Sequence, residues 1–199
     1  SQAHSNAVGF VNEYSDIFSI SGKNGPESIF AIQFNSDNED NVNITNLMFD
    51  PESLGGYASF LPDPSFVNSF DPVDKRKAVN VGTIDAGQAY ISKHRDPTVV
   101  PGGFGGTNWI VLRYSDILLM QSEAMHKINS GDANKFNGIN QIRTRAGLGS
   151  KLLNFANTPD DAAFVKALLD ERLWELCLEG HRRWDLIRFN KYVETKAAQ

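Results

Sequence analysis

The sequence predicts a mainly α-helical protein with one long irregular segment and a few short strands. In the second half, apolar residues recur at intervals of three and four, as on the buried face of a helix. Between residues 35 and 76 this periodicity is absent, whereas Asn, Asp, Ser, Gly and Pro are frequent. We therefore expect a single domain over 1–199, with an irregular loop and short-strand insertion at 35–107 and a helical scaffold at 108–199.

The N-terminal part of the chain contains one predicted helix and three predicted strands. Apolar residues at helical spacing predict an amphipathic helix over 5–19. Alternation of apolar with small or polar side chains predicts a strand over 28–34. Two further short strands are expected over 77–81 and 88–94, on either side of a turn.

The helical half has clear start and stop signals. A helical face runs over 114–128 and ends at Gly131, after which Asp132 is a predicted N-cap for a second helix closed by Gly147. A third helix is expected from Thr158-Pro159-Asp160-Asp161, which combines a cap, a proline and acidic residues in the first turn. The first two helices are joined by about three residues around Gly131, so they must lie antiparallel.

The first two of these helices resemble one tetratricopeptide hairpin. Ala124, Gly131 and Phe136 supply the small residue, the turn and the packing ring that such a repeat needs. We therefore expect a tetratricopeptide-like scaffold.

The stretch from Leu168 to Asn190 predicts a helix, a break at Gly180 and another helix. Glu171, Glu175 and Glu179 recur every four residues and so share one stripe of the helix. We expect them to form an ion network that holds two helices together, answered by the neighbouring arginines Arg172, Arg182, Arg183 and Arg188.

Four segments of the chain together resemble the C-terminal part of the SusD/RagB family, which are surface glycan-binding lipoproteins of outer-membrane nutrient uptake systems. They are, in order, Glu27 to Phe34, Asn108 to Ala124, Ile139 to Leu148 and Glu171 to Arg188. Members carry a lipidated N-terminal Cys and a larger helical half. Because the chain begins at Ser1 with neither an initiator Met nor a signal peptide, we expect a fragment of such a protein.

The resemblance implies a function without catalysis. A SusD-like protein caps a SusC-like TonB-dependent transporter, holds an oligosaccharide for import and does not hydrolyse it. It implies location at the extracellular face of the outer membrane, through a lipid anchor absent from this sequence. The helical blocks would be scaffold, and the irregular loops would supply much of the sugar contact.

Composition excludes several other functions. A formal charge of −5 without a basic stripe argues against nucleic-acid binding, and no run of 18 apolar residues could span a membrane. The glycine-rich run at 101–106 lacks the spacing of a nucleotide-binding loop. Since there is one cysteine, no intrachain disulfide can form. We expect Cys177 and the three tryptophans to pack in the core: Trp109, Trp174 and Trp184.

No catalytic or metal-binding set can be assembled from the sequence. No Gly-x-Ser-x-Gly turn is present. The acidic turn at 37–41 could surround calcium, but it lacks the Gly and Glu of an EF-hand loop, so a solvated turn is expected and calcium stays an alternative. Zinc is not expected, because the histidines show no ligand spacing: His4, His94, His126 and His181.

Aromatic recognition is the remaining candidate activity. A sugar ring offers an apolar C–H face edged by hydroxyls, which suits an aromatic ring beside polar side chains. The irregular segment supplies both, although its rings could instead fill a small core beneath the loop. The predicted ligand-binding residues are Tyr57, Phe60, Phe66, Phe70, Asn46, Asp50, Asp63 and Asn68.

Two alternatives remain open. The domain could act as a scaffold or lid of the transporter that binds peptide or another nutrient. It could also be a glycoside hydrolase, which needs two facing carboxylates, one with a raised pKa. The acids at 171, 175 and 179 share one helix beside several arginines, which lower carboxyl pKa values, so a structural role is preferred.

Overall fold

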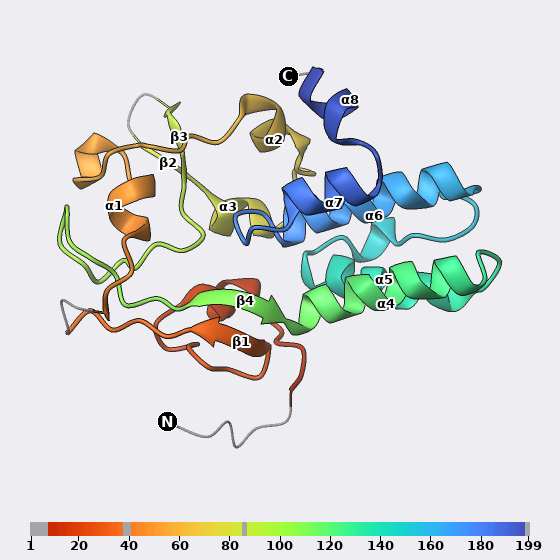
Figure 1. Cartoon of the computed structure of the whole chain (residues 1–199), viewed down its shortest axis with the longest axis horizontal. Coiled ribbons are helices and arrows are strands. Elements are labelled where there is room, and N and C mark those ends of the chain that lie inside the picture. Colours follow the sequence, from red (N-terminus) through yellow and green to blue (C-terminus); the bar gives the residue numbers. More distant parts are fainter. Residues whose placement is uncertain (1–7, 38–40, 85–86, 198–199) are drawn as a thin grey trace. The chain divides into compact units, whose positions relative to one another are not determined.

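The computed structural model describes residues 8–37, 41–84 and 87–197 (Figure 1). The chain divides into two compact units, Ser1–Tyr114 and Ser115–Gln199, and each is described by itself. Within the described part of the chain, no helix combines the length and the hydrophobicity required to cross a membrane.

The first unit is organised around a pair of strands far apart in sequence. Strand β1 (Ser28–Ile32) pairs antiparallel with β4 (Trp109–Arg113), with Ala31 opposite Ile110 (Figure 1). Beneath the pair lies a small apolar core that contains Tyr14, Ile17, Phe18 and Ile110. The predicted strand over 28–34 is thus confirmed for residues 28–32. Because β4 follows the long irregular segment in the chain, its pairing with β1 brings the two ends of that segment together.

The helix predicted over 5–19 is wrong for residues 8–13. Within the described part of the predicted range, 8–19, the helical structure is a single 3-10 turn, η1 (Tyr14–Phe18). Residues 5–7 lie outside the described residues. The amide of Val11 donates to the Glu27 carboxylate at 3.2 Å, and the amide of Gly9 donates to the Pro26 carbonyl at 2.9 Å. Because these amides bind the chain ahead of β1, they cannot take part in a helix.

The predicted hairpin forms, but its first strand starts later than expected. Strand β2 (Val81–Thr83) pairs with β3 (Ala89–Ile91). The preceding residues form helix α3 (Arg76–Asn80) instead of a strand. The Asp74 carboxylate accepts from the Arg76 backbone amide at 3.0 Å and from its guanidinium, which starts the helical turn.

The irregular segment is ordered as short turns. It contains α1 (Thr45–Phe49), η3 (Glu52–Leu54) and α2 (Pro64–Ser69). Each is too short to leave a helical period in the sequence, which is why the segment looks patternless.

The second unit is helical, as predicted. Asp132 accepts from the Asn134 amide, so this predicted cap is confirmed. The third helix begins within the predicted stretch, but its N-cap is Asp160, which accepts from the Ala163 amide, so Thr158 and Pro159 precede the helix. Its elements are α4 (Tyr114–Ile128), η5 (Ala133–Phe136), α5 (Asn137–Arg145), η6 (Gly149–Lys151), α6 (Asp161–Glu175), α7 (Arg182–Arg188) and α8 (Tyr192–Ala197).

Helices α4 and α5 approach each other at Gly138. A Cβ at this position would lie 2.4 Å from the Leu118 carbonyl oxygen. The sequence located the small residue of the hairpin at Ala124, whereas the close contact uses Gly138. The side chains of Leu119, Ile139, Ile142, Phe164 and Leu168 have no exposed surface and form the core of this unit.

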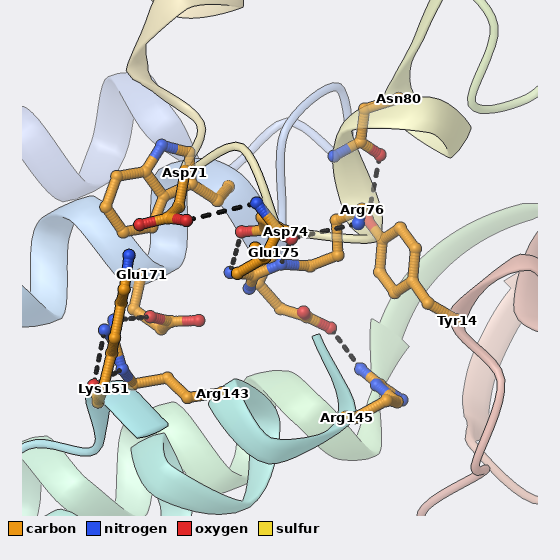
Figure 2. A network of polar contacts seen from close by, with 12 residues as sticks. Tyr14, Asp71, Asp74, Arg76, Asn80, Arg143, Arg145, Lys151, Glu171 and Glu175 are labelled. Atoms are coloured by element: carbon orange, nitrogen blue, oxygen red, sulfur yellow. Dashed lines mark hydrogen bonds and ion pairs between the residues drawn. The ribbon is translucent and has the colours of Figure 1, made fainter. Parts of the chain in front are cut away.

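Buried ion pairs join α5 to α6. Arg143 lies 2.8 Å from Glu171, and Arg145 lies 2.5 Å from Glu175 (Figure 2). The expected ion network is confirmed, but the arginines predicted as partners are wrong at these two sites. Successive residues of a helix point about 100° apart, so Arg172 faces away from Glu171 and binds Asp116 and Asp185 instead.

Trp184 does not pack in the core. Its side chain is 66% exposed, whereas Trp109 and Trp174 are half-buried. The next residue, Asp185, is buried and binds Arg172 at 2.7 Å, so this side of α7 is turned inward and Trp184 is turned outward. Cys177 is buried, as expected.

Candidate functional site: an aromatic platform

Two aromatic rings of the irregular segment face solvent. Tyr57 is 67% exposed and Phe60 is 56% exposed, although large aromatic side chains are normally mostly buried. The ring of Phe60 meets that of Phe49 edge to face, with centroids 5.6 Å apart. We name residues 45–60, which carry these rings, the aromatic platform.

The platform backbone folds back along α1. The amide of Tyr57 donates to the Leu47 carbonyl at 2.8 Å, and the amide of Ser59 donates to the Met48 carbonyl at 2.9 Å. The amide of Ala58 donates to the Asp50 carbonyl at 2.9 Å. Three consecutive amides are therefore fixed, and both exposed rings extend from ordered backbone.

The reversal before Tyr57 requires two glycines. Gly55 has a φ of 83°, and a Cβ there would lie 2.2 Å from the backbone nitrogen of Gly102. A Cβ at Gly56 would lie 2.1 Å from the Asp50 carbonyl oxygen. A side chain at position 55 would therefore push the platform away from the backbone of residues 101–102, and one at position 56 would collide with Asp50.

A pair of amide hydrogen bonds anchors the start of the platform. The Asn46 side chain donates to the Asp96 carbonyl and accepts from the Asp96 amide, both at 2.9 Å. Just before the platform, Asn43 and Gly105 exchange backbone hydrogen bonds at 2.8 Å in each direction. The segments around residues 43–46 and 96–105 are thus joined at two successive points.

Two carboxylates complete this framework. Asp50 accepts from Nε of Arg95 at 3.0 and 3.1 Å, and burial raises its pKa although the Arg95 charge opposes that rise. Burial also acts to raise the pKa of Asp96, but hydrogen bonds from Thr98 and from the Gly106 amide outweigh it and lower the pKa. Both carboxylates are used in holding the loops together.

The eight predicted ligand-binding residues fall into two groups. Tyr57, Phe60, Asp63 and Asn68 are exposed, and Asp63 is the N-cap of α2. Phe66 is half-buried and meets the buried ring of Phe70 edge to face at 5.1 Å. Also buried are Asn46 and Asp50.

A second surface feature, in the helical unit, was missed in the sequence. A groove of about 500 Å³ is lined by Met120, Lys127, His181 and Trp184, together with ion-paired acids and arginines of α4, α6 and α7. Arg188 binds Glu123 and Asp185 across it. Trp184 is the residue that could have indicated this groove, but its position in a helical pattern suggested that it was buried.

Metal ligands do not gather in the described residues, where no group of three His, Cys, Asp or Glu side chains is placed to hold an ion. The acidic turn considered for calcium lies partly outside the described residues.

The fold and the site together define a class of protein: an ion-paired helical-hairpin scaffold of the tetratricopeptide type, with an aromatic loop surface in its other unit. The chain belongs to the SusD family, whose family model matches residues 84–199. It is 32% identical over 157 residues to SusD-like protein P25 of Formosa agariphila, a match that covers 76% of this chain and 29% of the relative. SusD-like protein P38 of the same organism is 34% identical over 108 residues, covering 52% and 21%.

Solved structures share the fold. Surface glycan-binding protein A from Bacteroides thetaiotaomicron, in complex with laminarihexaose, matches with a TM-score of 0.73 at 20% identity, over 94% of this chain and 48% of that one. A SusD superfamily protein from Parabacteroides distasonis matches with a TM-score of 0.77 at 26% identity, over 92% and 44%. These matches confirm the expected family and the mainly helical fold. The chain spans less than half of these structures and under a third of the two curated relatives.

Proposed function

We propose that this chain binds an oligosaccharide without hydrolysing it, at the cell surface, as part of a SusC/SusD-like TonB-dependent nutrient uptake system. The observation that carries the proposal is the pair of exposed rings, Tyr57 and Phe60, on ordered backbone. The family membership and a neighbour crystallised with laminarihexaose support it.

The platform suits a sugar for physical reasons. An exposed ring can cover the apolar C–H face of a pyranose, and polar side chains beside such a ring can bind the hydroxyls at its edge. Because the backbone at Tyr57, Ala58 and Ser59 is already hydrogen-bonded, little conformational entropy of the loop is lost on binding.

Four buried carboxylates have structural partners, which supports a role in stability for them instead of catalysis. Glu171 and Glu175 are fully buried and bind arginines of α5, so neither is presented to a substrate. Asp50 and Asp96 hold loops together. The proposal predicts that no reducing sugar is released from any polysaccharide that the protein binds.

Affinity gel electrophoresis on a polysaccharide panel, followed by calorimetry, tests the proposal. Loss of one stacked ring removes about 0.5–1.5 kcal/mol, so Tyr57→Ala and Phe60→Ala should each weaken binding about 2- to 12-fold. Phe30→Ala is the matched control, since Phe30 is a 60% exposed ring on β1 outside the platform.

Three outcomes distinguish the candidate functions. Retardation by at least one glycan, weakened by the two platform variants but not by the control, supports the proposal. No response to any glycan, together with co-purification of a transporter that survives both platform variants, would favour the scaffold or lid. Release of reducing sugar would establish the hydrolase instead.

A further inference from the structure

The acidic residues around the aromatic platform restrict the kind of sugar that it can bind. Between Lys23 and Lys75 the sequence has no lysine, arginine or histidine, but it has nine aspartates and glutamates. The platform lies inside this stretch, so every formal side-chain charge on it is negative.

The cation that the structure brings to the platform is already neutralised. Arg95 comes from the neighbouring loop, and its Nε donates to both carboxylate oxygens of Asp50 at 3.0 and 3.1 Å. Asp50 is 4% exposed and Arg95 is 21% exposed, so the buried carboxylate balances a guanidinium that still reaches the surface. A sulfate or carboxylate on a ligand would therefore compete with Asp50 for this charge.

Two acidic residues lie within a few positions of the exposed rings in the sequence. Asp63 follows Phe60 by three residues, which limits their Cα separation to about 11 Å. Glu52 precedes Tyr57 across the compact turn in which the Gly55 amide donates to the Glu52 carbonyl at 2.9 Å. Both Glu52 and Asp63 are exposed. Charges at such distances act on a bound ligand at low ionic strength, because the Debye length is about 30 Å at 0.01 M salt, whereas the Debye length of about 8 Å in physiological salt screens most of the effect.

From this charge distribution we infer that the platform selects an uncharged oligosaccharide and discriminates against sulfated or uronate-rich ones. The inference rests on the proposed function and names its ligand class. Two like charges about 10 Å apart in water reduce binding about two-fold, and repeated anionic groups on a polymer multiply the effect. Bridging by a divalent ion would need clustered ligands, and none are grouped in the parts of the chain described here.

The test compares polysaccharides with the same backbone. Dextran, laminarin, mannan and galactan are each measured in neutral and in chemically sulfated form, by affinity electrophoresis and calorimetry, at 20 mM and 500 mM NaCl. We expect the neutral form that binds to exceed its sulfated form at least four-fold at low salt, and the ratio to approach one at high salt.

Charge reversal locates the effect on the platform. Glu52→Lys should narrow the affinity ratio between the neutral and the sulfated form by at least two-fold. Glu13→Lys changes the net charge equally, at an exposed position of the same unit outside the platform, and should leave the ratio unchanged.

The results separate this inference from the proposed function. Tighter binding of a sulfated form at low salt, or binding that calcium induces and EDTA abolishes, overturns the inference and leaves carbohydrate binding standing. Equal narrowing by both variants also overturns it, because the selectivity would then belong to net charge. If no glycan of either kind binds, the proposed function fails and the inference fails with it.

Discussion

Replacing Glu175 with leucine should strongly destabilise the helical unit. Glu175 is fully buried, and its partner Arg145, at 2.5 Å, is 2% exposed. The substitution leaves the guanidinium charged in a buried place, with the Ser115 hydroxyl as a neutral acceptor at 2.9 Å. Removing one member of a buried pair costs about 3–5 kcal/mol, a large part of the 5–15 kcal/mol by which typical domains are stable.

Urea denaturation and thermal denaturation, both monitored by circular dichroism at 222 nm, measure this cost as a free energy of unfolding and as a melting temperature. The melting temperature should fall by about 6–20 °C, since about 1 kcal/mol corresponds to 2–4 °C in a chain of this size. The double variant Arg145→Met with Glu175→Leu should be more stable than Glu175→Leu alone, because both charges of this pair are removed together. Lys166→Ala is the control: it breaks the exposed Lys166–Asp170 pair and should cost no more than about 0.5 kcal/mol.

The reasoning would be refuted by a Glu175→Leu protein within 1 kcal/mol of wild type. It would equally be refuted by a double variant no more stable than the single one. A folded Glu175→Gln protein that had lost a hydrolytic activity of the wild type would return this residue to a catalytic role.

Three further predictions concern separate parts of the chain. Burial and the nearby Lys135 lower the pKa of His126 below 6.5. The stability that the neutral imidazole confers is therefore complete above pH 6.5 and is lost as the pH falls. The urea midpoint of the wild type should drop between pH 8 and pH 5, and the midpoint of His126→Gln should drop less. Gly55→Ala should lower the free energy of unfolding by about 1–3 kcal/mol and weaken glycan binding, since its Cβ would lie 2.2 Å from a backbone nitrogen. Gly87→Ala is the control, because Gly87 has a similar φ and open space around it, and it should destabilise the protein less. Calorimetry of both variants measures the difference. Cys177 should react with a thiol reagent only after unfolding, and rapid labelling of the native protein would contradict its burial.

The helical half could be predicted because its signals are local. Asp132 is an N-cap in the structure, as its position in the sequence indicates, and the third helix begins within the predicted stretch 158–161, at Asp161. Which arginine meets Glu171 could not be predicted in the same way. The partner, Arg143, lies 28 residues away, and such pairing depends on how α5 packs against α6.

Two local patterns were misleading because tertiary contacts overrode them. The spacing of apolar residues before Tyr14 suits a helix, but the Val11 amide binds the Glu27 carboxylate instead. Trp184 sits in a helical pattern, yet the ion pairs of Asp185 decide which side of α7 faces inward. Intrinsic propensity is a weak guide wherever such contacts exist.

The candidate site was predictable as a segment but not ring by ring. Aromatic and polar residues without periodicity indicated a displayed loop, but nothing in the spacing separates exposed Tyr57 from buried Phe70. The framework residues have side-chain amides and carboxylates that resemble ligand contacts in composition. Asn46 shows the ambiguity, since its amide binds the Asp96 backbone.

That amide contact has a consequence for how the loop can diversify. The Asn46 side chain hydrogen-bonds to the main-chain nitrogen and oxygen of residue 96, atoms that every amino acid except proline provides. Substitutions on the outer surface of the loop therefore need not disturb its attachment. Under the proposed function, new sugar preferences could arise by exchange of a few outward side chains, while the hydrogen bonds between Asn46 and residue 96 stay the same.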